Sequence, residues 1–139
     1  MKRMLAVLLV LMISAGCTAC CRGDTAHTVV IPGIGSDFFT DRELKVGIDE
    51  IEACFCRDFP GCTLRTIQYA GDVMSLQWSH RHRAMVFISS FDVDESGCEG
   101  TLEPNSTYKG WQWILIRNAE GTWELEATGH LLDTQTKKG

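Results

Sequence analysis

Alternating apolar and polar residues near the C-terminus predict a β-hairpin. Trp111 and Trp113 share one face of the first segment, and Trp123 begins a similar alternation after the turn-forming residues 118–121. A side-chain period of two on both sides of a turn is typical of paired antiparallel strands. The first segment is apolar on both faces, so we expect it to lie inside a sheet and to be covered more fully than the second.

A different period marks residues 41–58. Leu44, Ile48, Ile51 and Phe55 recur at steps of four, three and four residues. These steps place all four side chains on one stripe of an α-helix. The pattern therefore predicts an amphipathic helix that packs this stripe against the rest of the domain.

The residues around this helix define its ends and one close contact. Thr40 is followed three residues later by Glu43, which is the spacing of a capping box. Phe59-Pro60-Gly61 should stop the helix. Gly47 costs about 1 kcal/mol relative to alanine within a helix. Its place at the edge of the stripe suggests that a strand approaches closely there.

Further strands are predicted between the helix and the hairpin. Residues 62–69 and 84–93 have β-type patterns, and residues 28–31 could form a short strand that Pro32 ends. Residues 94–108 form a polar connection that is long for a hairpin, which favours either mobility or a functional role.

A second, shorter helix is predicted over residues 72–79. We expect Val73, Leu76 and Trp78 to face inward, because they are its large apolar residues.

The N-terminus has the pattern of an export signal. Basic residues at 1–3 precede an apolar run at 4–13, which is too short to be a permanent membrane span. Small residues then precede Cys17, as in the lipobox of bacterial lipoproteins, although Ser14 stands where that pattern usually has leucine. We therefore predict lipidation at Cys17, with diacyl and palmitate-type anchoring at the cell membrane. The alternative is a secretory signal cut near Ala19.

Composition and charge are those of one globular domain without affinity for nucleic acid. The chain has 139 residues, of which 45% are hydrophobic and 22% charged. Its formal charge is −5, and removal of a leader carrying Lys2 and Arg3 would make it −7. Such an acidic chain has no basic footprint for nucleic acid. The predicted organisation is a signal peptide, a flexible tether, an α+β domain and a disordered tail, at residues 1–16, 17–35, 36–130 and 131–139.

Seven cysteines accompany the export signal. If Cys17 carries lipid, six remain in a compartment where disulfides can form. Their connectivity cannot be deduced from spacing. A Cys54–Cys62 or Cys62–Cys98 bridge is one interpretation. The preferred interpretation is that the cysteines are small residues that pack in the domain or stay free.

A metal site is a weak candidate at His80 and His82. In an extended segment both rings project to the same side and could supply two ligands for zinc or copper. A third ligand would have to come from His130, Cys98 or an acid, and neighbouring arginines oppose a cation. A basic exposed loop is the preferred interpretation, so no cofactor is predicted.

Several stretches together resemble a known family. They are FPGCTL (59–64), SSFDVD (89–94), GTLEPNSTYKGWQWILIR (100–117) and the turn at 121–123. The chain resembles the DUF4829-type uncharacterised bacterial lipoproteins. The resemblance implies an NTF2-like (cystatin-like) α+β fold, with one long helix packed on a curved antiparallel sheet of about four strands. The segment at 79–83 departs from the family, which has an acidic helix there. The family has no assigned activity.

This fold suggests two functions. The first is a non-catalytic domain, tethered outside the cell through its lipid, that binds an unknown protein or small-molecule ligand. The second is a small-molecule-binding or catalytic pocket within the curled sheet, lined by Trp111, Trp113 and Trp123. Packing of these tryptophans in the core is the preferred interpretation. The sequence contains no nucleophile elbow or phosphate-binding loop, so no catalytic residue is predicted.

Overall fold

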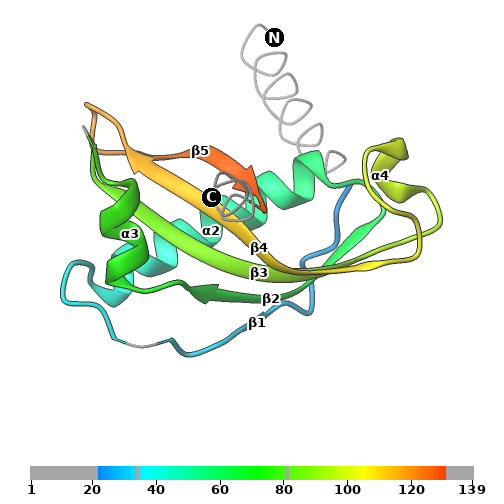
Figure 1. Cartoon of the computed structure of the whole chain (residues 1–139), viewed down its shortest axis with the longest axis horizontal. Coiled ribbons are helices and arrows are strands. Elements are labelled where there is room, and N and C mark those ends of the chain that lie inside the picture. The colour runs from blue at the N-terminus through cyan, green and yellow to red at the C-terminus, as the bar shows by residue number, and fades with distance from the viewer. Residues whose placement is uncertain (1–21, 34, 81, 131–139) are drawn as a thin grey trace, which may run out of the picture.

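The protein folds into a mixed α+β domain around a five-stranded sheet (Figure 1). The computed structural model describes residues 22–33, 35–80 and 82–130. The predicted signal peptide, Cys17 and the predicted tail at 131–139 lie outside the described residues. In chain order the elements are β1 (Val29–Val30), α2 (Asp41–Asp58), β2 (Cys62–Tyr69), α3 (Asp72–Trp78), β3 (Ala84–Val93), α4 (Gly97–Gly100), β4 (Thr107–Arg117) and β5 (Trp123–Gly129).

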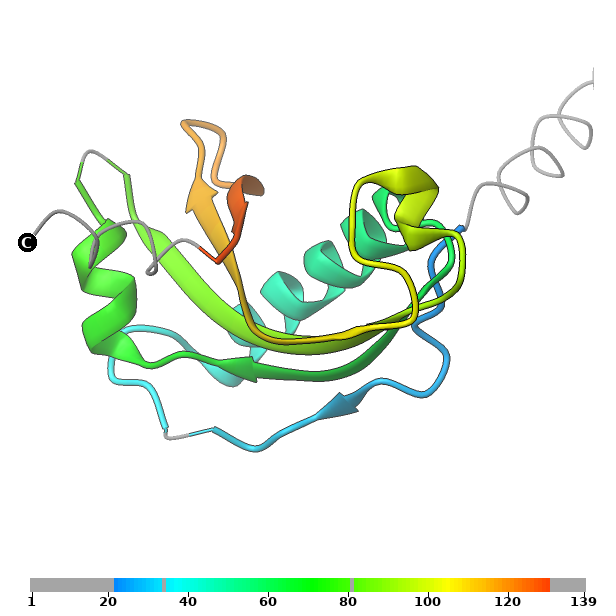
Figure 2. The ribbon, with the colours of Figure 1, turned by 45° about the vertical axis from the view of Figure 1, so that its right-hand side comes forward.

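The sheet has the strand order β1-β2-β3-β4-β5. The expectation of about four strands is corrected, because Val29–Val30 adds a short edge strand parallel to β2. The other neighbours are antiparallel, and each of these three pairings contains a register shift. Such irregularities bend strands and increase their twist. Figure 2 shows β3 and β4 bending along their length, with α2 on the inner side of the bend.

Helix α2 has the predicted bounds and the predicted cap. The Glu43 backbone N–H donates to Thr40 Oγ1 over 3.2 Å, and the Thr40 N–H donates to Glu43 Oε2 over 2.9 Å. The helix is not the only one in the described chain, because the short helices α3 and α4 accompany it. The architecture is therefore broader than one long helix on a sheet.

The predicted orientation of α3 is wrong. Val73 is 73% exposed and Leu76 is 62% exposed, whereas Ser75 is buried. Ser75 Oγ donates to the Tyr69 hydroxyl over 3.0 Å and accepts the Val86 N–H over 3.1 Å. The helix therefore docks on β3 through a polar side chain, which the hydrophobic pattern could not indicate.

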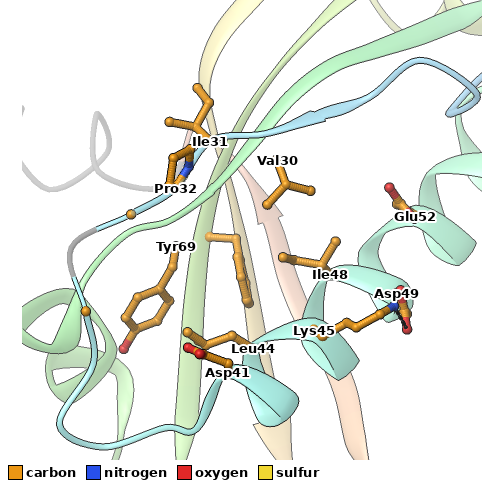
Figure 3. A pocket seen from close by; sticks show the side chains of 13 residues that line it. Val30, Ile31, Pro32, Asp41, Leu44, Lys45, Ile48, Asp49, Glu52 and Tyr69 are labelled. Carbon is orange, nitrogen blue, oxygen red and sulfur yellow. Dashed lines mark hydrogen bonds and ion pairs between the residues drawn. The ribbon is translucent and has the colours of Figure 1, made fainter.

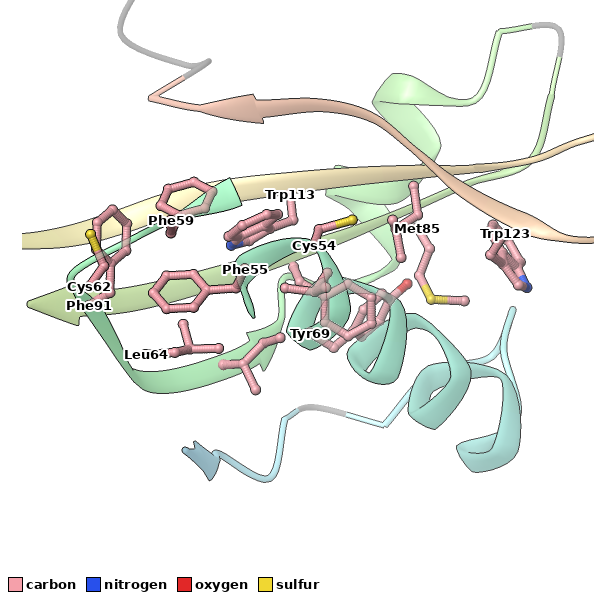
Figure 4. Close-up of a cluster of buried hydrophobic side chains, with 14 of the residues drawn as sticks. Cys54, Phe55, Phe59, Cys62, Leu64, Tyr69, Met85, Phe91, Trp113 and Trp123 are labelled. Atoms are coloured by element: carbon pink, nitrogen blue, oxygen red, sulfur yellow. The ribbon is translucent and has the colours of Figure 1, made fainter. Parts of the chain in front are cut away.

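The core lies between α2 and the sheet and is rich in aromatic rings (Figure 4). Phe55 of α2 stacks on Phe59 with ring centroids 4.9 Å apart. Phe91 and Trp113 of the sheet contact the same two rings. The predicted stripe of α2 and the predicted inner strand β4 are thus brought together at one end of the helix.

Residues 22–33, expected within the tether, run beside the domain. The Arg22 and Gly23 N–H groups both donate to the Cys56 carbonyl, and the Ile31 N–H donates to the Ile67 carbonyl over 2.9 Å. This segment therefore forms one wall of the domain beside α2 and β2. Within the described part of the chain, no helix has the length and apolar character needed to cross a membrane.

Candidate functional site: a groove between α2 and β1

A groove of about 540 Å³ separates the first half of α2 from β1 and the residues that follow it (Figure 3). Its volume lies within the range of roughly 300–1,000 Å³ that is typical of small-molecule sites. The lining residues are Val30, Ile31, Pro32, Gly33, Gly35, Asp41, Leu44, Lys45, Ile48, Asp49, Glu52, Tyr69 and Phe87.

The groove exists because the apolar stripe of α2 is covered along only part of its length. Ile51 and Phe55, which we call the closed half, are fully buried. Leu44 and Ile48, which we call the open half, are only half-buried and line the groove. Two helical turns of one continuous stripe therefore meet different surroundings.

Strand β1 forms the opposite wall without closing over the helix. It has only two residues, and Pro32 follows it closely. Proline lacks a backbone N–H and cannot extend the ladder as a donor. Val30 lines the groove and remains 48% exposed. The wall is thus apolar and open to solvent.

Two aromatic residues form the back of the groove. Tyr69 of β2 is paired in register with Phe87 of β3, and their ring centroids are 5.7 Å apart. Gly47 allows the helix to approach them, since a Cβ atom there would lie 2.8 Å from Phe87 Cε2. The close approach predicted for Gly47 is confirmed.

Charged residues of α2 form the rim. Lys45 Nζ pairs with Asp49 Oδ2 over 3.2 Å, and Asp41 and Glu52 lie at the same rim. Burial raises the pKa of Glu52, and the charge of Asp49 raises it further, whereas Lys45 lowers it. Acidic groups outnumber the one lysine along the groove. The rim therefore favours a positively charged group over an anion.

Asp72 holds the end of the groove in place. Its Oδ1 accepts hydrogen bonds from the Ser36 hydroxyl over 2.6 Å and from the Tyr69 hydroxyl over 2.7 Å. Its Oδ2 accepts a hydrogen bond from the Asp37 N–H over 2.8 Å. These bonds, led by the one from Ser36, lower the pKa of Asp72. Burial raises the pKa of Tyr69. One carboxylate thus ties the segment before α2 to the wall of the groove.

The three predicted pocket tryptophans do not line this groove. Trp113 is buried, and its Nε1–H donates to Ser89 Oγ over 2.7 Å. The half-buried Trp111 donates its Nε1–H to Thr128 Oγ1 over 2.7 Å. Trp123 is buried against Phe39, with ring centroids 5.6 Å apart. All three pack with other residues of the domain, and the two polar N–H groups of Trp111 and Trp113 are already bonded.

The weak metal candidate gains no further ligand. His80 and His82 are exposed in the segment between α3 and β3. His130, named as a third ligand, instead packs against Trp111, with ring centroids 5.2 Å apart. Among residues 22–33, 35–80 and 82–130, no group of three or more His, Cys, Asp or Glu side chains could hold a metal ion.

Sequence reasoning missed the groove residues as a set. The helical stripe identified Leu44 and Ile48, but as core residues. Asp72 could have been noticed as the acidic first residue of a short helix, yet its partner Ser36 lies 36 positions away. No local pattern links these two residues, because the fold alone brings them together.

Comparisons of the chain with protein-family models, with curated proteins and with solved structures find no match.

Proposed function

We propose that the protein is a lipid-anchored, extracytoplasmic domain of NTF2-like type that binds a small amphipathic ligand without transforming it. The observation that carries this proposal is the groove beside the open half of α2. It leaves Leu44 and Ile48 partly uncovered next to a strand that cannot close over them. Filling it would remove apolar surface from water, which stabilises a complex by about 25 cal/mol per Å².

The groove favours a ligand with an apolar body and a cationic end. Val30, Ile31, Leu44, Ile48 and Phe87 offer apolar contacts. The rim carboxylates offer the complementary charge, and Glu52 is the one whose ionisation is disfavoured before a cation arrives. A bound ammonium group would therefore stabilise the ionised Glu52 carboxylate, which is disfavoured in the free protein.

Binding is favoured over catalysis by the residues that the groove contains. No serine, threonine, cysteine or histidine is among its described lining residues, so it offers no serine- or cysteine-type nucleophile beside a histidine base. Lys45 is paired with Asp49, and the Tyr69 hydroxyl is bonded to Asp72. Both of these titratable groups are thus already paired, and the interior of the groove is apolar.

Titration calorimetry with decyltrimethylammonium, below its micelle concentration, tests this function. We expect saturable binding, with decyl sulfate binding at least about tenfold more weakly. Ile48→Asn should weaken binding of the cation about tenfold or more, because it places an amide in the apolar groove. The matched control is Val46→Asn, since Val46 lies on the same helix, is 46% exposed and is outside the groove lining. Equal effects of both variants would contradict the proposal.

The role of Glu52 has a separate test. Binding of the cation should tighten as pH rises through the raised pKa of Glu52, because the ionised form pairs with the ligand. Glu52→Gln should abolish this part of the pH dependence. Glu126→Gln removes the same charge from an exposed position on β5 and should leave it unchanged. A pH profile identical in all three proteins would exclude Glu52 as the cation partner.

The proposed location rests on the N-terminal sequence pattern. Cys17→Ser should release the protein from the membrane fraction of its host, because the thiol that would carry the diacyl anchor is removed. Unchanged membrane retention would contradict lipidation at Cys17. Release of the unsubstituted protein into the medium would instead support the secreted alternative.

A further inference from the structure

Two buried thiols meet at the end of the domain opposite the groove. Cys62 begins β2 and is 1% exposed, and Cys98 lies in α4 and is 4% exposed. Burial raises the pKa of Cys62, and Cys98 lies near enough to raise it further. Cys62 Sγ also lies 3.8 Å from the Pro60 carbonyl, and Cys98 Sγ lies 3.9 Å from the Asp58 carbonyl. Both sulfurs therefore lie beside the end of α2 and the turn that follows it.

The backbone around Cys98 is held in an unusual conformation that points this side chain inward. Gly97, Cys98, Glu99 and Gly100 all have positive φ, at 62°, 54°, 56° and 84°. L-residues other than glycine rarely adopt this region, and strain of this kind is found at functional sites. Glu99 is exposed while Cys98 is buried. The strained turn therefore places the Cys98 side chain in the interior and leaves Glu99 at the surface.

Hydrogen bonds around both cysteines hold the two thiols near each other. Cys62 pairs with Val93 in the β2–β3 ladder, and the Asp94 N–H donates to the Gly61 carbonyl over 3.0 Å. Thr101 Oγ1 donates to the Cys98 carbonyl over 2.7 Å. The segment that carries Cys98 is thus anchored beside Cys62 before any bond joins them.

The two thiols differ from the other described cysteines. Cys54 is a free buried thiol whose sulfur lies 3.8 Å from Glu50 Oε1 and 3.6 Å from Arg57 Nη2. Cys56 is disulfide-bonded. Cys62 and Cys98 are the free described cysteines that contact each other.

We propose that Cys62 and Cys98 are a redox-active dithiol that closes to an intramolecular disulfide by exchange with a small-molecule or protein disulfide. This bond would fasten the segment between β3 and β4 to the start of β2. The order of attack follows from the environment of each sulfur. Cys62 is held in the β2–β3 ladder and is 1% exposed, whereas Cys98 lies in the connection between β3 and β4 and is 4% exposed, so Cys98 is the first nucleophile. Burial, with the neighbouring Cys98, also raises the pKa of Cys62.

The exchange balances in two steps. The Cys98 thiolate attacks one sulfur of the disulfide RSSR, forms a mixed disulfide with it and releases one RSH, which takes the proton that Cys98 lost. Cys62 then attacks Cys98 Sγ, the second R–S group leaves, and the proton of Cys62 passes to it. Two protein thiols are oxidised and one disulfide is reduced to two thiols.

Tryptic mapping of the intact protein, equilibrated with defined ratios of reduced and oxidised glutathione, tests the pairing. Trypsin separates the thiols, because Cys62 lies in peptide 58–65, Cys98 in peptide 84–109, and Cys54 with Cys56 in peptide 46–57. We expect 58–65 linked to 84–109, at a mass two hydrogens below their sum, in most of the protein when oxidised glutathione dominates. The oxidised form should unfold at a temperature higher by on the order of 10 °C.

Other products of the same experiment would overturn the pairing. These are two unmodified thiols at every ratio, a stable glutathione adduct on Cys98 without closure, a bridge from either peptide to Cys54, or linkage between two molecules. Cys54→Ala is the matched control, because it removes a buried thiol of the same helix–sheet layer and should leave the linked peptides unchanged. Loss of the link in that variant would also count against the proposal.

Discussion

The two halves of the stripe on α2 have the same sequence character and different surroundings. The closed half, Ile51 and Phe55, is buried beneath the aromatic rings of the core. The open half, Leu44 and Ile48, faces a groove whose other wall is a two-residue strand. An amphipathic period therefore specifies which side of a helix is apolar, but not how much of that side the domain covers.

Truncating the stripe at matched positions gives the largest expected contrast. Ile51→Ala should lower the free energy of unfolding by about 2–5 kcal/mol, because it leaves a cavity in a closed core. Ile48→Ala, one turn away, should cost only about 1 kcal/mol, because solvent already reaches this side chain. Urea unfolding of both variants measures the difference. Equal losses would mean that the stripe is covered uniformly and that the groove is closed in solution.

The second-largest expected effect concerns the hydrogen bond between Trp113 and Ser89, in the core beside the closed half of α2. Ser89→Ala should cost about 1–3 kcal/mol, because the buried Trp113 indole N–H loses its acceptor. Urea unfolding and tryptophan fluorescence would report this. Ser90→Ala, on the opposite face of β3, is a control for the loss of a hydroxyl from the same strand. No measurable cost for Ser89→Ala would imply that water reaches Trp113, as a tryptophan-lined pocket would require.

A smaller effect is expected at the boundary between the halves. Gly47→Ala would place a Cβ atom 2.7 Å from Met85 Sδ and 2.8 Å from Phe87 Cε2. The overpacking, costing about 1–3 kcal/mol, should outweigh the gain of about 1 kcal/mol in helix propensity. We therefore expect a net loss of about 1 kcal/mol in urea unfolding. A stabilised variant would show that the helix can move away from the sheet freely.

The smallest expected effect is the pH dependence of stability that Asp72 causes at the end of the groove. Since the folded-state pKa of Asp72 is lowered, its contribution to stability is present above its unfolded pKa and disappears as pH falls through the folded value. The melting temperatures of the unsubstituted protein and Asp72→Asn should therefore differ near neutral pH and converge below about pH 4. A constant difference down to acid pH would mean that the carboxylate does not hold Ser36 and Tyr69.

Local patterns predicted the elements well, because each depends on residues close together in sequence. The capping box fixed the start of α2, and the alternation around Trp113 predicted the buried strand β4. The orientation of α3 was predicted wrongly, since Ser75 docks it through hydrogen bonds that a count of apolar residues ignores. The edge strand β1 was too short for its pairing to be inferred from a period of two.

The candidate site was less predictable than the fold. Trp111 and Trp113 were correctly placed on one face, and that face packs against core aromatic rings. A period of two cannot distinguish a side chain in the core from one in a cavity on the same side of a sheet. The groove depends on where the segment before α2 runs, and Asp72 fixes that segment through residues distant in sequence.

Methyl NMR during titration with decyltrimethylammonium shows directly whether a ligand binds beside the open half of α2. We expect saturable chemical-shift changes at the methyl groups of Leu44, Ile48 and Val30, with the methyl groups of Ile51 and Leu64 almost unchanged. Changes that are absent, or spread equally over both halves of the stripe, would contradict a ligand groove at the open half of α2.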